Sequence, residues 1–156
     1  MNKKDIETIK KKVIHDFSNG LYCAESVVIA ITKSQGIESD LLPKAATAFC
    51  SGMARTCGTC GALTGAIMGV SAVMGRSERG ESVEKLYAAT QKLVNTFEDE
   101  FGAKHCHELL GCDLGTPEGQ DHFRNNHLHE SHCLKYAARA AEIAVTLIAG
   151  EDSEGD

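Results

Sequence analysis

Four of the seven cysteines in this 156-residue chain stand at the expected starts of helices: Cys23, Cys60, Cys106 and Cys133. A helix N-terminus directs unpaired N–H groups and the positive end of the helix dipole outward, which lowers the pKa of a thiol placed there. The thiolate is the form that binds metals and attacks disulfides. Four thiolates gathered from four helices would therefore suit a tetrahedral metal ion or an iron–sulfur cluster.

Two alternatives use the same cysteines without a metal. Free cysteine is among the most buried residue types, so each of the four could be a small core residue. A dithiol that cycles to a disulfide could instead pair Cys57 with Cys60, the ends of a CxxC sequence, or Cys106 with Cys112. No strand is expected before this CxxC and no histidine follows it, which argues against a thioredoxin-like site and against covalent haem attachment.

The histidines offer a third chemistry. His129 and His132 lie three residues apart just before Cys133, and His105 and His107 flank Cys106. Cysteines combined with these histidines could form a zinc-binding structural module, although the usual zinc-finger spacing is absent. A solvated polar segment is the simpler interpretation of the late histidines. No Ser/His/Asp arrangement, phosphate loop or carboxylate pair stands out, so no catalytic residue is assigned, and oxidoreductase and electron carrier both stay open.

The elements that must position these residues are predicted to be helices throughout. Apolar residues recur three or four apart, and no alternating run indicates a strand. Residues 50–59, rich in Gly, Ser, Thr and Cys, are expected to form a loop. The expected helices cover approximately residues 6–17, 23–36, 42–49, 60–74, 83–101, 106–110, a segment starting at Thr116-Pro117, and 131–148.

The helix expected over residues 60–74 is small and apolar nearly all round, which is typical of a helix buried on most sides. Gly61, Gly65 and Gly69 recur every four residues and give it one flat face, which a neighbouring helix or a second subunit could approach closely. We therefore predict an all-α fold: a single-domain bundle of about six to seven helices with a buried Gly/Ala-rich central helix. Residues 1–150 would form this domain and residues 151–156 an acidic disordered tail.

Composition limits the kinds of binding partner and the cellular compartment that we expect for this protein. The net charge of -6 disfavours nucleic acid, whose phosphates would be repelled. No window reaches the roughly 18 consecutive apolar residues of a membrane span. An odd number of cysteines without an export signal argues against a secreted disulfide framework, so we expect a cytoplasmic protein.

The pattern of motifs resembles the redox-active protein family named for a C…CGAxxG…C…C signature. The central motif is similar to Cys60–Gly65, and the leading cysteine to the one in Tyr22–Ser26. The glycine-rich segment before the family's central motif resembles Cys50–Met53. The family's third cysteine resembles Cys106, within Phe101–Gly111, and its fourth resembles Cys133. The resemblance covers roughly residues 5 to 148.

The resemblance implies four functional cysteines with a redox role. It also suggests kinship with a domain of the dimeric split-Soret cytochromes, in which an iron–sulfur centre accompanies haem, and hence a homodimer. We expect Cys23, Cys60, Cys106 and Cys133 to bind a [2Fe–2S] or [4Fe–4S] cluster for electron transfer or redox sensing with a redox partner protein. Zinc, or no metal, are the alternatives. The cysteines at 50, 57 and 112 depart from the pattern, and Cys57 and Cys112 are candidates for additional ligands or resolving thiols.

Overall fold

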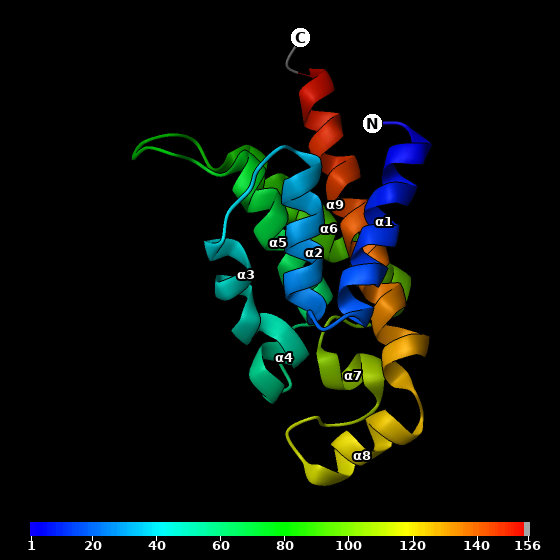
Figure 1. Cartoon of the computed structure of the whole chain (residues 1–156). Helices are drawn as coiled ribbons and strands as arrows, with labels where there is room; N and C mark the ends of the chain where they lie inside the picture. The colour runs from blue at the N-terminus through cyan, green and yellow to red at the C-terminus, as the bar shows by residue number, and fades with distance from the viewer. Residues whose placement is uncertain (155–156) are drawn as a thin grey trace.

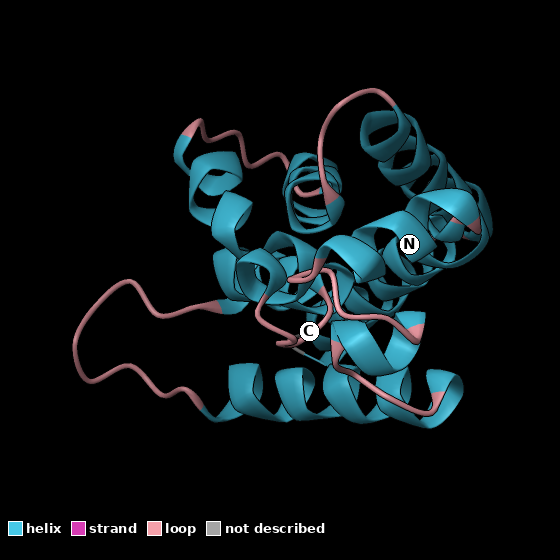
Figure 2. Cartoon of the chain, turned by 90° about the horizontal axis from the view of Figure 1, so that it is seen from below, coloured by secondary structure: helices cyan, strands magenta, loops and turns pink. Residues whose placement is uncertain are grey.

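Long helices form the framework of the molecule, a computed structural model that describes residues 1–154 (Figure 1). α5 (Gly61–Met74) lies at the centre, between α2 (Cys23–Ser34) on one side and α6 (Glu84–Phe101) and α9 (Leu134–Glu154) on the others. α1 (Lys3–Ser18) packs against α2 and α9. The predicted all-α fold is confirmed: residues 1–154 contain no strand and a single isolated β-bridge (Figure 2).

Short elements gather at the end of the bundle opposite the two termini (Figure 1). They connect the long helices and carry two of the four predicted site cysteines, Cys106 and Cys133. In chain order they are α3 (Leu41–Ala46), the 3₁₀ helix η1 (Thr47–Phe49), α4 (Cys50–Arg55), α7 (Cys106–Leu110), α8 (Pro117–Asn125) and the π-helix η2 (His129–Cys133).

Local sequence signals explain where α1 and α8 begin. The Asn2 side chain caps α1 by accepting hydrogen bonds from the N–H groups of Lys4 and Asp5. The Asp5 carboxylate in turn accepts a hydrogen bond from the Asn2 N–H. Thr116 caps α8 through a 3.0 Å hydrogen bond from the Gly119 N–H, with Pro117 at the first helical position. The start of α8 was predicted from Thr116 and Pro117, whereas the cap at Asn2 was not.

The glycine face of α5 is covered by α2. A Cβ added at Gly65 would lie 2.6 Å from the carbonyl oxygen of Ala24, and one at Gly69 would lie 2.8 Å from two carbon atoms of Ile31. Because real Cβ atoms essentially never come this close to other heavy atoms, glycine at these two positions lets the two helices pack at this distance. The predicted close contact is confirmed, and the element that makes it is a helix of the same chain.

Two sequence predictions about element boundaries were wrong. Residues 50–59 are not simply a loop, because Ser51–Arg55 form a turn of left-handed helix with φ between 55° and 66°. The last α-helix starts at Leu134 rather than at Ser131, because His129–Cys133 wind into a π-helical turn first. α9 then continues to Glu154, and residues 155 and 156 of the predicted tail lie outside the described residues.

Within residues 1–154, no helix combines the length and the apolar character that a membrane span requires.

Candidate functional site

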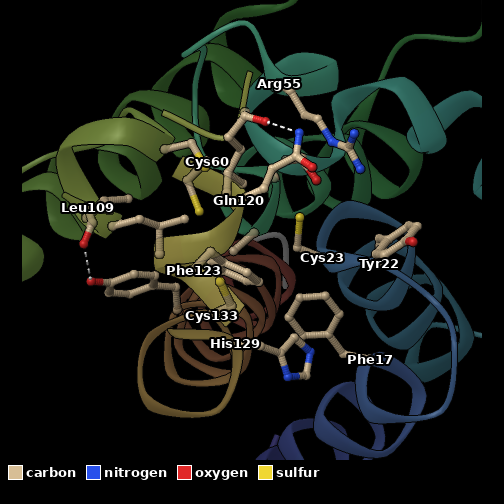
Figure 3. A pocket seen from close by; sticks show the side chains of 18 of the residues that line it. Phe17, Tyr22, Cys23, Arg55, Cys60, Leu109, Gln120, Phe123, His129 and Cys133 are labelled. Carbon is tan, nitrogen blue, oxygen red and sulfur yellow. Dashed lines mark hydrogen bonds between the residues drawn. The ribbon is translucent and has the colours of Figure 1, made fainter. Parts of the chain in front are cut away.

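One pocket collects all four predicted site cysteines. It has a volume of about 230 Å³ and lies where the lower ends of α2, α5, α7 and α9 meet. Figure 3 shows the sulfurs of Cys23, Cys60 and Cys133 pointing toward the same space, and Cys106 also lines it. The rest of the wall is mainly apolar and aromatic, with Phe17, Leu109, Leu110, Leu114, Phe123 and Tyr136.

A short antiparallel bridge fixes Cys60 relative to Cys106. Thr59 pairs with His105, the Cys60 N–H donates to the Lys104 carbonyl at 2.8 Å, and the Cys106 N–H donates to the Gly58 carbonyl at 2.9 Å. In this pattern the two cysteines lie on the same face as diagonal neighbours, a separation of about 7–8 Å in regular strands. Backbone pairing thus places the two cysteines side by side on one face.

Cys23 is placed by the first turn of α2 and by Gly61. The turn is fixed by the buried Glu25, which accepts hydrogen bonds from the Tyr22 N–H at 2.8 Å and the Thr47 hydroxyl at 2.7 Å. A Cβ at Gly61 would lie 2.2 Å from the Cys23 sulfur, so this glycine leaves the space that the thiol occupies. The glycine after Cys60 therefore positions the first cysteine of the site.

Cys133 ends the π-helical turn, which leads directly into α9. π-turns inside helices are rare and occur frequently at functional sites. The same turn carries His129, whose ring packs on Phe17 with 4.5 Å between centroids and also lines the pocket. The sequence predicted Cys133 at the start of a helix. In the structure its position is instead set by the irregular backbone of the π-helical turn.

The left-handed turn of α4 forms another part of the wall. A left-handed helix costs about 1–2 kcal/mol for each residue that carries a side chain, and Ser51, Met53, Ala54 and Arg55 all adopt it. Two hydrogen bonds close the turn. The Thr56 hydroxyl donates to the Met53 carbonyl at 2.7 Å, and the Gly58 N–H donates to the Gly52 carbonyl at 2.9 Å. Strain of this kind persists where the surroundings impose it, commonly at functional sites.

Gly52 shows why this strained turn lies where it does. Its φ is 66°, and an added Cβ would lie 2.4 Å from the Cys106 Cβ. The left-handed backbone therefore approaches Cys106 directly and brings Ser51, Gly52 and Arg55 to the pocket.

The thiol pKa values run opposite to the prediction from helix ends. Burial raises the pKa of Cys60 to about 11, although the N–H groups of Ala62 and Leu63 bond its sulfur and act in the other direction. Burial also raises the pKa of Cys106 to about 12 and that of Cys133 further, with repulsion among the cysteines adding to the effect. Desolvation outweighs the helix N-terminus here, so the metal-free site holds protonated thiols.

These pKa values predict slow alkylation in the metal-free protein. At pH 8, a thiol with a pKa of 11 instead of 9 has about a hundredfold less thiolate, and thiolate is the species that reacts. Iodoacetamide labelling followed by peptide mass spectrometry should therefore modify Cys57 and Cys112 well before Cys60. Equal labelling rates at Cys57 and Cys60 would show that the Cys60 thiol is not desolvated.

The remaining candidates lie outside this pocket. Cys57 is next to the carboxylate of Asp113, which raises the pKa of its thiol, and Cys112 does not line the pocket. His132 contacts the Ser131 hydroxyl and the Tyr136 ring instead of facing the site. Among the side chains that the structure describes, those of residues 1–150, no three of Cys, His, Asp or Glu are close enough together to hold one metal ion.

Two features of the site were missed at the sequence level. Gln120, Phe123 and Arg124 of α8 line the pocket, although nothing in their spacing indicated it. Cys50 was considered only as a departure from the family pattern, yet it lies against Cys23. Its position depends on contacts between residues 27 apart in the chain, which periodicity does not report.

Comparison with known proteins identifies the family of the chain. A search of curated proteins and a search of solved structures returned no match. A family model covers residues 21–147, a span that begins just before Cys23 and includes all four pocket cysteines. The chain therefore belongs to the family described as "Putative redox-active protein (C_GCAxxG_C_C)".

Proposed function

We propose that Cys23, Cys60, Cys106 and Cys133 hold an iron–sulfur cluster that serves electron transfer or redox sensing. The observation that carries the proposal is the convergence of these four thiols on one pocket of about 230 Å³. They come from segments spread over 110 positions of the chain. Four cysteines are the ligand set that both [2Fe–2S] and [4Fe–4S] clusters use.

The spacing of the thiols favours a cluster over zinc. A tetrahedral zinc ion with bonds of about 2.3 Å holds its sulfurs about 3.8 Å apart. No three potential ligands in residues 1–150 are grouped tightly enough for one ion, and Cys60 and Cys106 are diagonal neighbours across the bridge. In a cluster no iron atom takes more than two of the four cysteines, one on each iron in [4Fe–4S] and two in [2Fe–2S], so the four sulfurs stand around a larger volume.

The residues around the thiols suit a redox centre. When bound, an iron–sulfur cluster accepts and releases single electrons. The apolar wall limits water access, and hydrogen bonds to the sulfurs come from the Ser51 N–H at Cys23 and the Ala62 and Leu63 N–H groups at Cys60. Such bonds stabilise negative charge at the ligands and raise the reduction potential.

Iron, acid-labile sulfide and zinc content, measured on protein purified without oxygen, test the proposal. We expect iron and sulfide in matching amounts together with broad visible absorption. Stoichiometric zinc with no iron would favour the structural zinc alternative. A colourless, metal-free protein that also fails to take up iron and sulfide on reconstitution would contradict the proposal and leave a metal-free dithiol.

A further inference from the structure

Cys50 packs against Cys23 and does not line the pocket. It is 4% exposed and packs with Ala24, Val28 and Ala46, and Cys23 contacts the same cluster. One point in space, the position of a Cβ at Gly61, is 2.2 Å from the Cys23 sulfur and 3.1 Å from the Cys50 Cα. The two thiols are within hydrogen-bonding reach of each other.

Backbone groups hold both sulfurs in this arrangement. The Cys50 sulfur receives the N–H groups of Ala24 and Glu25 in the first turn of α2, and its own S–H points to the Ala46 carbonyl 3.6 Å away. The Cys23 sulfur receives the N–H of Ser51, the residue after Cys50. The strained left-handed turn therefore begins immediately after Cys50 and ties its backbone to Cys23.

This pair differs from the other cysteines. The largest influence on the Cys23 thiol is the Cys50 thiol, and the reverse also holds. Burial is the first cause of the raised pKa of Cys60, Cys106 and Cys133, and Cys60 acts on the other two only through charge. Sulfurs within hydrogen-bonding reach on two neighbouring backbones need little rearrangement to meet the geometry of a disulfide, whose Cβ atoms stand about 3.8 Å apart.

We propose that Cys23 and Cys50 form a reversible disulfide when a peroxide oxidises the metal-free protein, and that this bond withdraws Cys23 from the four-cysteine site. The disulfide itself stands on the geometry of the pair. Its effect on the site rests on the proposed function. Cys50 then acts as a redox control on cluster assembly without being a ligand.

The chemistry balances with hydrogen peroxide as the oxidant. Peroxide oxidises one sulfur of the pair, which takes one oxygen atom to become a sulfenic acid while one water leaves. The sulfur of the other cysteine then attacks it, the S–S bond forms, and the hydroxyl leaves as a second water with the proton of the attacking thiol. Two thiols have lost two electrons and two protons to one peroxide. A dithiol reverses the reaction by exchange and is itself oxidised to a cyclic disulfide.

Peptide mapping of the whole chain tests the bond directly. Metal-free, reduced protein is treated with hydrogen peroxide, blocked with iodoacetamide in denaturant and digested with trypsin without reductant. Trypsin releases Cys23 on peptide 13–33 and Cys50 on peptide 45–55, and neither peptide contains another cysteine. We expect these two peptides to be linked after peroxide. The link should be absent in Cys50→Ala, retained in the matched control Cys112→Ala, and removed by dithiothreitol.

Iron and sulfide incorporation into parallel samples, taken before blocking and digestion, tests the effect on the site. Peroxide-treated protein should take up at least about tenfold less iron than reduced protein, since a ligand is missing, and dithiothreitol should restore uptake. Oxidation of other cysteines with no 13–33/45–55 link, or unchanged iron uptake when the link is complete, would overturn the inference. A complete link in a protein that takes up no iron even when reduced would support the disulfide and contradict the proposed function.

Discussion

Cys60→Ala is expected to lower the iron and sulfide content of the protein by at least about tenfold, because losing a ligand costs more than losing an outer partner, which itself costs 10–100-fold in affinity. Cys60 is 8% exposed, lines the pocket and is fixed by the bridge to the segment that carries Cys106. Iron, sulfide and visible absorption after anaerobic purification provide the measurement. The fold should survive, because alanine is a smaller apolar residue at a helix N-cap.

Cys112→Ala is the matched control for this experiment. Its thiol lies six residues beyond Cys106, outside the pocket lining, and so it should not change the iron content. Equal iron loss in both variants would indicate that cysteine substitution destabilises the chain in general. Full iron content in Cys60→Ala would remove Cys60 from the ligand set.

Gly65→Leu is expected to have the largest effect on stability. Even a Cβ at this position would lie 2.6 Å from the Ala24 carbonyl oxygen and 2.8 Å from its Cα, and backbone cannot yield as a side chain can. Overpacking of this kind typically costs about 1–3 kcal/mol. A loss of about 2–3 kcal/mol would lower the melting temperature by about 4–12 °C for a chain of this size, as followed by circular dichroism.

Gly150→Ala separates this packing effect from helix propensity. Gly150 is an exposed glycine in α9, and an added Cβ there meets nothing within 4 Å. Alanine should stabilise the helix by about 0.5–1 kcal/mol relative to glycine. A Gly65→Leu variant that melts no lower than wild type would show that α2 and α5 are not in close contact.

The regular helices could be predicted because their signals are local. The spacing of Ile9, Val13 and Phe17 determined the buried face of α1, and all three are buried. The Thr116-Pro117 pair marked the start of α8. The repeat of Gly61, Gly65 and Gly69 predicted a close helix contact, because a helix face without side chains lets a neighbouring helix approach its backbone.

The irregular parts of the site could not be predicted because their causes are not local. Propensity does not anticipate left-handed φ at four residues with side chains, since each is unfavourable alone and is sustained by surrounding contacts. The π-turn before Leu134 has no sequence signal of its own. The direction of the thiol pKa values also depended on tertiary burial, which outweighed the helix-end effect at Cys60.

The most direct test of the four-cysteine cluster is iron X-ray absorption on the anaerobically purified protein. A cluster held by Cys23, Cys60, Cys106 and Cys133 predicts a first shell of sulfur alone and a short iron–iron distance, both lost in Cys60→Ala. An iron shell of oxygen and nitrogen with no iron–iron scattering would contradict the account, because iron would then lie outside the thiol pocket.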